Sequence, residues 1–166
     1  MKKIILASLV LVSTAAFSAD IPDPAKTPGA LNPNVTQDNI QQTICVKGWT
    51  KTIRPPVRYT NNLKLQQMAE LGLTGNPSDY EEDHLISLEL GGHPKDPKNL
   101  WPQLWVGDWG ARRKDVLETY LKTQVCKGTV TLSEAQTAMA TDWVAAYKKY
   151  ITENPKHPRN LKKKSG

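Results

Sequence analysis

The stretch Tyr80-Glu-Glu-Asp-His-Leu-Ile-Ser-Leu-Glu-Leu-Gly-Gly-His-Pro-Lys-Asp-Pro-Lys-Asn-Leu-Trp-Pro-Gln103 decides how this chain of 166 residues is interpreted. Within it, Asp83 and His84 stand before an apolar run that ends at a pair of glycines, Gly91-Gly92. A polar loop follows, and then Asn99-Leu100-Trp101. Because glycine pairs and proline-containing polar stretches end regular elements, this order predicts a strand, a loop and a second short strand.

Asp83 and His84 have the side chains that hydrolysis of a phosphodiester bond requires. The attacking water must lose a proton, and an imidazole with an ordinary pKa of about 6.5 is the side chain best matched to that step near neutral pH. A hard cation such as Mg²⁺ prefers carboxylate oxygens and neutralises the leaving oxyanion. Neighbouring side chains on a regular strand point to opposite faces, so both residues reach one site only where the strand is twisted or bulged.

These residues, together with Gly91-Gly92, the Asn99-Leu-Trp-Pro-Gln103 segment and Lys114-Asp115, resemble the HNH endonucleases and most closely their small secreted members. The resemblance implies an α+β, mainly helical fold in which a ββα-metal motif packs against additional helices. It implies that His84 is the general base and that Asn99 ties the two strands together and orients the histidine. It makes Asp83 a metal ligand.

The same resemblance implies a divalent metal cofactor, Mg²⁺ first, with Mn²⁺ or Zn²⁺ as alternatives, and a nucleic acid substrate, DNA with RNA as an alternative. The family places a third motif residue, His or Asn, on the following helix, near Gly110 or Arg112, yet residues 100–115 contain neither type. Asp108 has a plausible spacing and is the expected second metal ligand, with Asp115 in reserve. This departure keeps open a noncatalytic protein that binds nucleic acid or another polyanion on an HNH-like scaffold.

Residues 1–19 have the pattern of a secretory signal peptide, with lysines, an apolar stretch and small residues before Asp20. No later run approaches the roughly 18 apolar residues of a membrane span, so we expect a periplasmic or secreted protein without a span in its mature form. Cys45 and Cys126 are the two cysteines, and an oxidising compartment predicts a disulfide between them, with two buried free thiols as the alternative.

The formal net charge of +6 is concentrated at the two ends of the chain, because the body from Asp20 to Pro155 holds 15 basic and 16 acidic residues. Overall charge therefore does not indicate nucleic-acid binding, whereas local clusters can. One cluster comprises Lys51, Arg54 and Arg58, and another comprises Arg112, Arg113 and Lys114. We expect Arg112, Arg113 and Lys114 to bind the substrate backbone, with a solvated helix face as the alternative.

The sequence predicts four successive parts: a signal peptide over 1–19, an extended proline-rich segment over 20–59, an HNH-like domain with a C-terminal helix over 60–154, and a basic disordered tail over 155–166. Helices are expected from Thr60 or Asn61 to Gly72, over about 109–124 with its N-terminus at the metal, and from the capping-box sequence Thr131-Leu-Ser-Glu134 to about Thr152.

Trp101, Trp105 and Trp109 recur every four residues beside the motif. Pro102, Gly107 and Gly110 argue against one continuous helix there. We expect the tryptophans to anchor the core or the loop, and the alternative is a platform on which the bases of a single strand stack.

Overall fold

The computed structural model describes residues 21–157, which are predominantly helical and contain one two-stranded antiparallel sheet. The elements are α1 (Trp49–Ile53), α2 (Val57–Glu70), β1 (Tyr80–His84), β2 (Leu100–Leu104), α3 (Ala111–Cys126) and α4 (Leu132–Tyr147). The expected α+β, mainly helical fold class is confirmed. The expected signal peptide and most of the expected tail lie outside the described residues. Within 21–157, no helix is both long and apolar enough to span a membrane.

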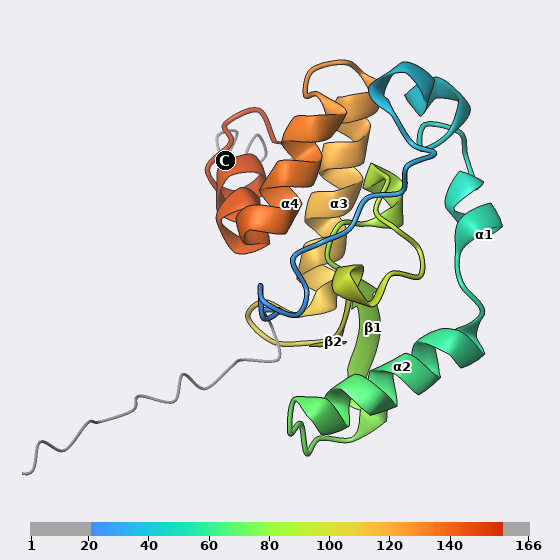
Figure 1. The fold of residues 1–166 in the computed structure, drawn as a ribbon. Helices are drawn as coiled ribbons and strands as arrows, with labels where there is room; N and C mark the ends of the chain where they lie inside the picture. The colour runs from blue at the N-terminus through green and yellow to red at the C-terminus, as the bar shows by residue number, and fades with distance from the viewer. Residues whose placement is uncertain (1–20, 158–166) are drawn as a thin grey trace, which may run out of the picture.

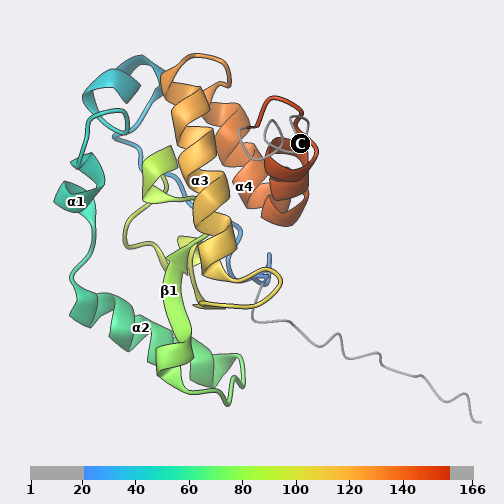
Figure 2. The same cartoon turned by 180° about the vertical axis from the view of Figure 1, so that it is seen from behind.

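The small sheet separates α2 from the beginning of α3, and α4 lies alongside α3 (Figures 1 and 2). In β1, alternate side chains are buried: Tyr80, Glu82 and His84 are more buried than the two residues between them. The face that bears His84 borders α2, and the face that bears Asp83 meets the first turns of α3. The two central motif residues are thus on opposite sides of β1, as regular strand geometry requires.

The first strand lies earlier in the chain than the apolar run suggested. Leu85, Ile86, Leu88 and Leu90 follow β1 and are all buried, whereas a strand of a one-sided sheet would expose alternate residues. The Ser87 hydroxyl accepts a hydrogen bond from the Glu89 N–H at 3.2 Å and opens a short 3-10 turn over Leu88–Leu90. The run therefore folds back into the core beneath α3 instead of pairing.

The helix boundaries agree with the local signals at most ends. Helix α2 begins at Val57, earlier than expected, directly after Pro56, whose non-helical backbone with ψ of 140° ends the preceding connector. It ends at Glu70, and Gly72 adopts a left-handed conformation with φ of 66°. At the start of α4 the capping box is confirmed: the Thr131 hydroxyl accepts from the Glu134 N–H, and the Glu134 carboxylate accepts from the Thr131 N–H.

The core lies between α3, α4 and the 85–90 turn. Leu117, Leu121 and Val125 of α3 pack with Met139 and Trp143 of α4, and all five are at most 2 % exposed. Burying such side chains stabilises the fold by about 1.5–3 kcal/mol each. The face of α3 that does not meet the sheet is therefore fixed against α4.

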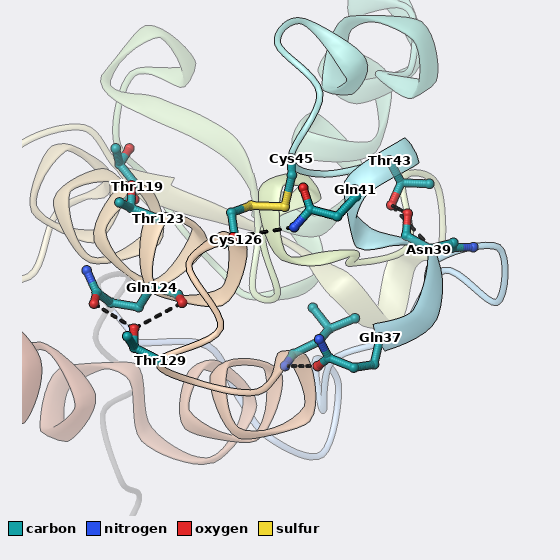
Figure 3. Close-up of a disulfide and its surroundings, with 11 residues drawn as sticks. Gln37, Asn39, Gln41, Thr43, Cys45, Thr119, Thr123, Gln124, Cys126 and Thr129 are labelled. Carbon is teal, nitrogen blue, oxygen red and sulfur yellow. Dashed lines mark hydrogen bonds between the residues drawn. A yellow bond between two sulfur atoms is a disulfide. The ribbon is translucent and has the colours of Figure 1, made fainter.

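The disulfide expected between Cys45 and Cys126 is present, with the two Cα atoms 5.7 Å apart. It joins the end of α3 to the segment that leads into α1, and the Gln41 side-chain amide donates to the Cys126 carbonyl beside it (Figure 3). The preceding chain is less extended than expected, since Gln37–Gln42 forms a 3-10 helix and Ile40 and Ile44 are buried in the core. A disulfide is compatible with an oxidising compartment.

Candidate functional site

His84 occupies the last position of β1, and its ring is held by the loop that joins the two strands. The Nε2 atom lies 3.0 Å from the carbonyl oxygen of Pro94. Because a carbonyl only accepts, Nε2 carries the hydrogen and the lone pair is on Nδ1. Burial lowers the pKa of His84 to about 4, although the hydrogen bond to Pro94 opposes the shift. The imidazole is therefore neutral at pH 7, with a basic nitrogen on its Nδ1 side.

The Nδ1 atom keeps a route to solvent. No described residue hydrogen-bonds to it, and it is not among the fully buried polar atoms that lack a partner. His84 lines a cleft of about 250 Å³ between β1 and the segment that runs from Arg54 into α2. Arg54 and Lys64 supply cationic side chains to this cleft. Lys64 is already bound to the carbonyls of Pro77 and Tyr80, whereas Arg54 is exposed.

Asn99 connects the end of β1 with the loop that holds His84. It is fully buried, and its Oδ1 accepts from the Ile86 N–H at 2.9 Å. Its Nδ2 donates to the carbonyls of Ile86 at 3.0 Å and His93 at 3.1 Å. The neighbouring carbonyl, that of Pro94, is the one that holds the His84 ring. Asn99 thus links the two strand ends and fixes, through the loop, the group that orients His84.

Gly92 allows the backbone of this loop to approach the end of β1. A Cβ atom at this position would lie 1.7 Å from the Ile86 carbonyl oxygen and 2.9 Å from Asn99 Nδ2. No side chain fits in that space. The glycine pair that suggested a turn in the sequence therefore has a second role, since it lets the Asn99 amide reach both chain segments.

Asp83 faces α3 and is paired with a buried lysine. Its Oδ1 accepts from the His84 N–H at 2.7 Å, and its Oδ2 lies 2.9 Å from Lys114 Nζ. The same ammonium donates to the His84 carbonyl at 2.6 Å and to the Glu118 carboxylate. Burial alone would lower the pKa of Lys114, but the carboxylates of Asp83 and Glu118 raise it, so the ammonium stays charged.

The three residues expected to bind substrate backbone are placed differently from one another. Lys114 is fully buried and turned toward β1, so it does not reach a phosphate at the surface. Arg112 and Arg113 are exposed on the first turn of α3. The Arg113 guanidinium lies over the rings of Trp109, at 5.2 Å, and Tyr147, at 5.7 Å. Only the two arginines are available to an anion from solvent.

Besides Glu82, on the opposite face of β1, two carboxylates near Asp83 have perturbed pKa values. Burial raises the pKa of Glu81 to about 8, and the charges of Asp83 and Asp115 add to the shift. Burial and the charge of Glu118 likewise raise the pKa of Asp115 to about 6. Sequence reasoning missed Glu81 and Glu118, although strand alternation places Glu81 beside Asp83 and the i, i+4 spacing places Glu118 beside Lys114.

The donor atoms around Asp83 do not form a coordination set for Mg²⁺ as they are placed. Both Asp83 oxygens already accept hydrogen bonds, one of them from an ammonium. Asp108 is exposed in the loop between β2 and α3 and does not contribute to the pKa shifts of Glu81 or Asp115. Across 21–157, no three His, Cys, Asp or Glu side chains converge on a metal position. We therefore derive no chemical step through a metal, and Mg²⁺ stays a prediction for experiment.

The three tryptophans beside the motif have separate environments, because β2 ends at Leu104 and a loop follows. Trp101 is buried against the core, and Trp109 packs edge-on against Trp143 at 5.8 Å. The expected anchoring role is confirmed for these two. Trp105 is partly exposed and lines the His84 cleft.

Comparison of the chain with models of protein families, with curated proteins and with solved structures finds no match. The interpretation of the site therefore depends on the geometry above and on the HNH resemblance of the motif residues. Arg54 is a further residue that the motif did not point to. Two features of the sequence could have identified Arg54: it belongs to a basic cluster, and it stands directly before two prolines. These prolines fix the backbone where the chain enters the cleft.

Proposed function

We propose that this protein is a secreted or periplasmic endonuclease of the HNH type that hydrolyses phosphodiester bonds of DNA, or of RNA, with low sequence specificity. The observation that supports it most is the state of His84: it lines a cleft together with Arg54, its imidazole is neutral, its Nε2–H is held by the Pro94 carbonyl, and its Nδ1 has no hydrogen-bond partner among the described residues. A general base needs this combination of a fixed ring, an available lone pair and access to water.

In the proposed reaction, Nδ1 of His84 removes a proton from water, and the resulting hydroxide attacks phosphorus. The bond between phosphorus and the leaving sugar oxygen breaks, that oxygen takes up a proton from solvent water, and the His84 imidazolium returns its proton to solvent. Arg54 would bind the non-bridging oxygens, since a guanidinium forms two parallel hydrogen bonds with a phosphate. A bound phosphate also raises the pKa of a neighbouring imidazole. Substrate binding therefore makes His84 a stronger base than it is in the free protein.

Low sequence specificity follows from the kind of contacts that the cleft offers. Arginine contacts to phosphate hold a nucleic acid in place but carry no information about its bases. The HNH resemblance adds an expected requirement for a divalent cation, so any assay must vary the metal.

A plasmid-nicking assay with Mg²⁺, with Mn²⁺ and with EDTA tests the proposal on the parent protein and on His84→Ala. We expect cleavage by the parent and a loss of at least 100-fold in the variant, which is the lower range for removing a general base. Arg54→Ala should reduce the rate, while Arg58→Ala, in the same basic cluster but not lining the cleft, should not. Equal cleavage by parent and His84→Ala would disprove the role of His84.

A noncatalytic polyanion-binding protein is the second candidate, and one observation favours it. The ammonium of Lys114 already lies against Asp83, where the motif would place a cation. Binding of nucleic acid by the parent, without cleavage in Mg²⁺, in Mn²⁺ or in EDTA, would support this candidate over the nuclease.

A further inference from the structure

Trp105 lines each of three neighbouring hollows in the surface. The first is the His84 cleft. The second, of about 330 Å³, includes Asp79 and Arg112, and the third, of about 280 Å³, includes Arg112, Arg113 and Tyr147. Because all three share Trp105, and the last two also share Arg112, they lie next to one another between His84 and the first turn of α3, and we call this series of hollows the path.

The cationic groups along this path have donors to spare. No described residue forms a hydrogen bond or an ion pair with the guanidinium of Arg54 or Arg112, and Arg113 makes only its two ring contacts. Lys64, by contrast, already donates to two backbone carbonyls, and Lys114 uses its three donors on one carbonyl and two carboxylates. An anion that enters the path therefore meets arginines on both sides of Trp105.

A tryptophan between arginines is suited to an unpaired nucleotide. Base-aromatic stacking needs the face of a base, which is available in a single strand and covered by neighbouring pairs in a duplex. The adjacent residue, Val106, is 65 % exposed and extends the apolar surface of the loop. Asp79 also lines the path, and its carboxylate restricts phosphates to the arginine positions.

We propose that Trp105 stacks on a base of single-stranded nucleic acid, with flanking phosphates at Arg112 and Arg54, so that the strand is led into the His84 cleft. This inference rests on the proposed function, because it names the form of nucleic acid that the same site takes. The inference predicts that the protein prefers single strands to duplexes. The catalytic residues alone predict no such preference.

Fluorescence anisotropy with a labelled single-stranded oligonucleotide and the matching duplex, both of about 12 nucleotides, tests the inference. The His84→Ala protein is used throughout so that the probe is not cleaved. Adding Trp105→Ala should weaken single-strand binding roughly 5- to 150-fold, the range that corresponds to loss of one stacked base. Trp105→Phe should retain most of the affinity. Leu65→Ala, at an exposed apolar residue of α2 that lines none of the three hollows, is the control and should be close to the parent. Arg112→Ala should reduce the salt slope of binding by about one phosphate contact.

The outcomes separate this inference from the proposed function. Single-strand binding that depends on Trp105, in a parent that cleaves nothing, keeps the inference and removes the enzyme. Cleavage that depends on His84, with binding unchanged in Trp105→Ala, removes the inference and keeps the enzyme. Equal affinity for single strand and duplex, or no binding of either, also overturns the inference. Melting temperatures of all variants must match the parent within a few degrees, and Trp105→Leu, which also lacks an aromatic face, replaces Trp105→Ala if the latter fails to fold.

Discussion

Lys114 and Asp83 form an ion pair with 2.9 Å between Nζ and Oδ2, although they are 31 positions apart in the chain and the lysine is fully buried. The pair joins the first turns of α3 to the end of β1. Because Nζ also binds the His84 carbonyl, the backbone next to the proposed base is held by the same ammonium.

Replacing Lys114 by methionine should lower the free energy of unfolding by about 3–5 kcal/mol. The change leaves the Asp83 and Glu118 carboxylates near each other without their cation, and breaking a buried ion pair from one side has this cost. Urea denaturation at pH 7 measures it. Lys127→Met, at the exposed end of the same helix, is the control and should change stability little. Equal midpoints for the two variants would contradict the assigned role of Lys114.

Glu82 should make the protein less stable as the pH rises. Burial, with a contribution from Asp83, raises its pKa from 4.5 to about 8, and neither carboxylate oxygen has a hydrogen-bond partner. A carboxyl whose pKa is higher in the folded state favours folding when protonated, so that stability is lost between about pH 4.5 and pH 8. In EDTA, Glu82→Gln should increase the unfolding free energy at pH 8 by on the order of 2 kcal/mol. Glu70→Gln, which is exposed, should leave the pH profile unchanged.

Asn99→Ala should both destabilise the protein and impair the proposed base. The Ile86 N–H and two carbonyls lose their partner inside the protein, and such buried groups cost about 1–3 kcal/mol each when unsatisfied. Thermal unfolding gives the stability, and cleavage measured well below the melting temperature gives the activity. Asn62→Ala, on the exposed surface of α2, is the matched control. A folded Asn99→Ala protein with undiminished cleavage would show that the loop does not need this side chain to orient His84.

Removing the disulfide should reduce stability by about 4 kcal/mol in the chain-entropy model, given the 81 positions between Cys45 and Cys126. The Cys45→Ser, Cys126→Ser double variant and the reduced parent should have similar melting temperatures, both below that of the oxidised parent. An unchanged melting temperature after reduction would show that the disulfide does not stabilise the fold.

Sequence signals that depend only on residues close together in the chain were sufficient to predict much of this fold. The capping box at Thr131, the left-handed Gly72 and the helical pattern of α3 each depend on nearby residues, and each is found where expected. The disulfide followed from compartment and cysteine count alone. Alternation along a strand likewise anticipated that Asp83 and His84 point to opposite faces.

The structure differs from the sequence-based expectations at places where segments distant in the chain come into contact. The run from Leu85 to Leu90 has the composition of a strand, but its position beneath α3 lets consecutive side chains be buried from a turn. Lys114 follows two exposed arginines in a pattern typical of a solvated helix face. Its burial depends on Asp83, which only the tertiary fold brings within reach. Arg54 enters the cleft for the same reason.

The ammonium of Lys114 is a counterion that is covalently part of the polypeptide. A domain whose carboxylates are balanced by a dissociable ion assembles only when that ion is supplied and comes apart when a chelator takes it away. Here the charge that balances Asp83 and Glu118 is a side chain of the same polypeptide, so β1 and α3 can pack together without a dissolved ion.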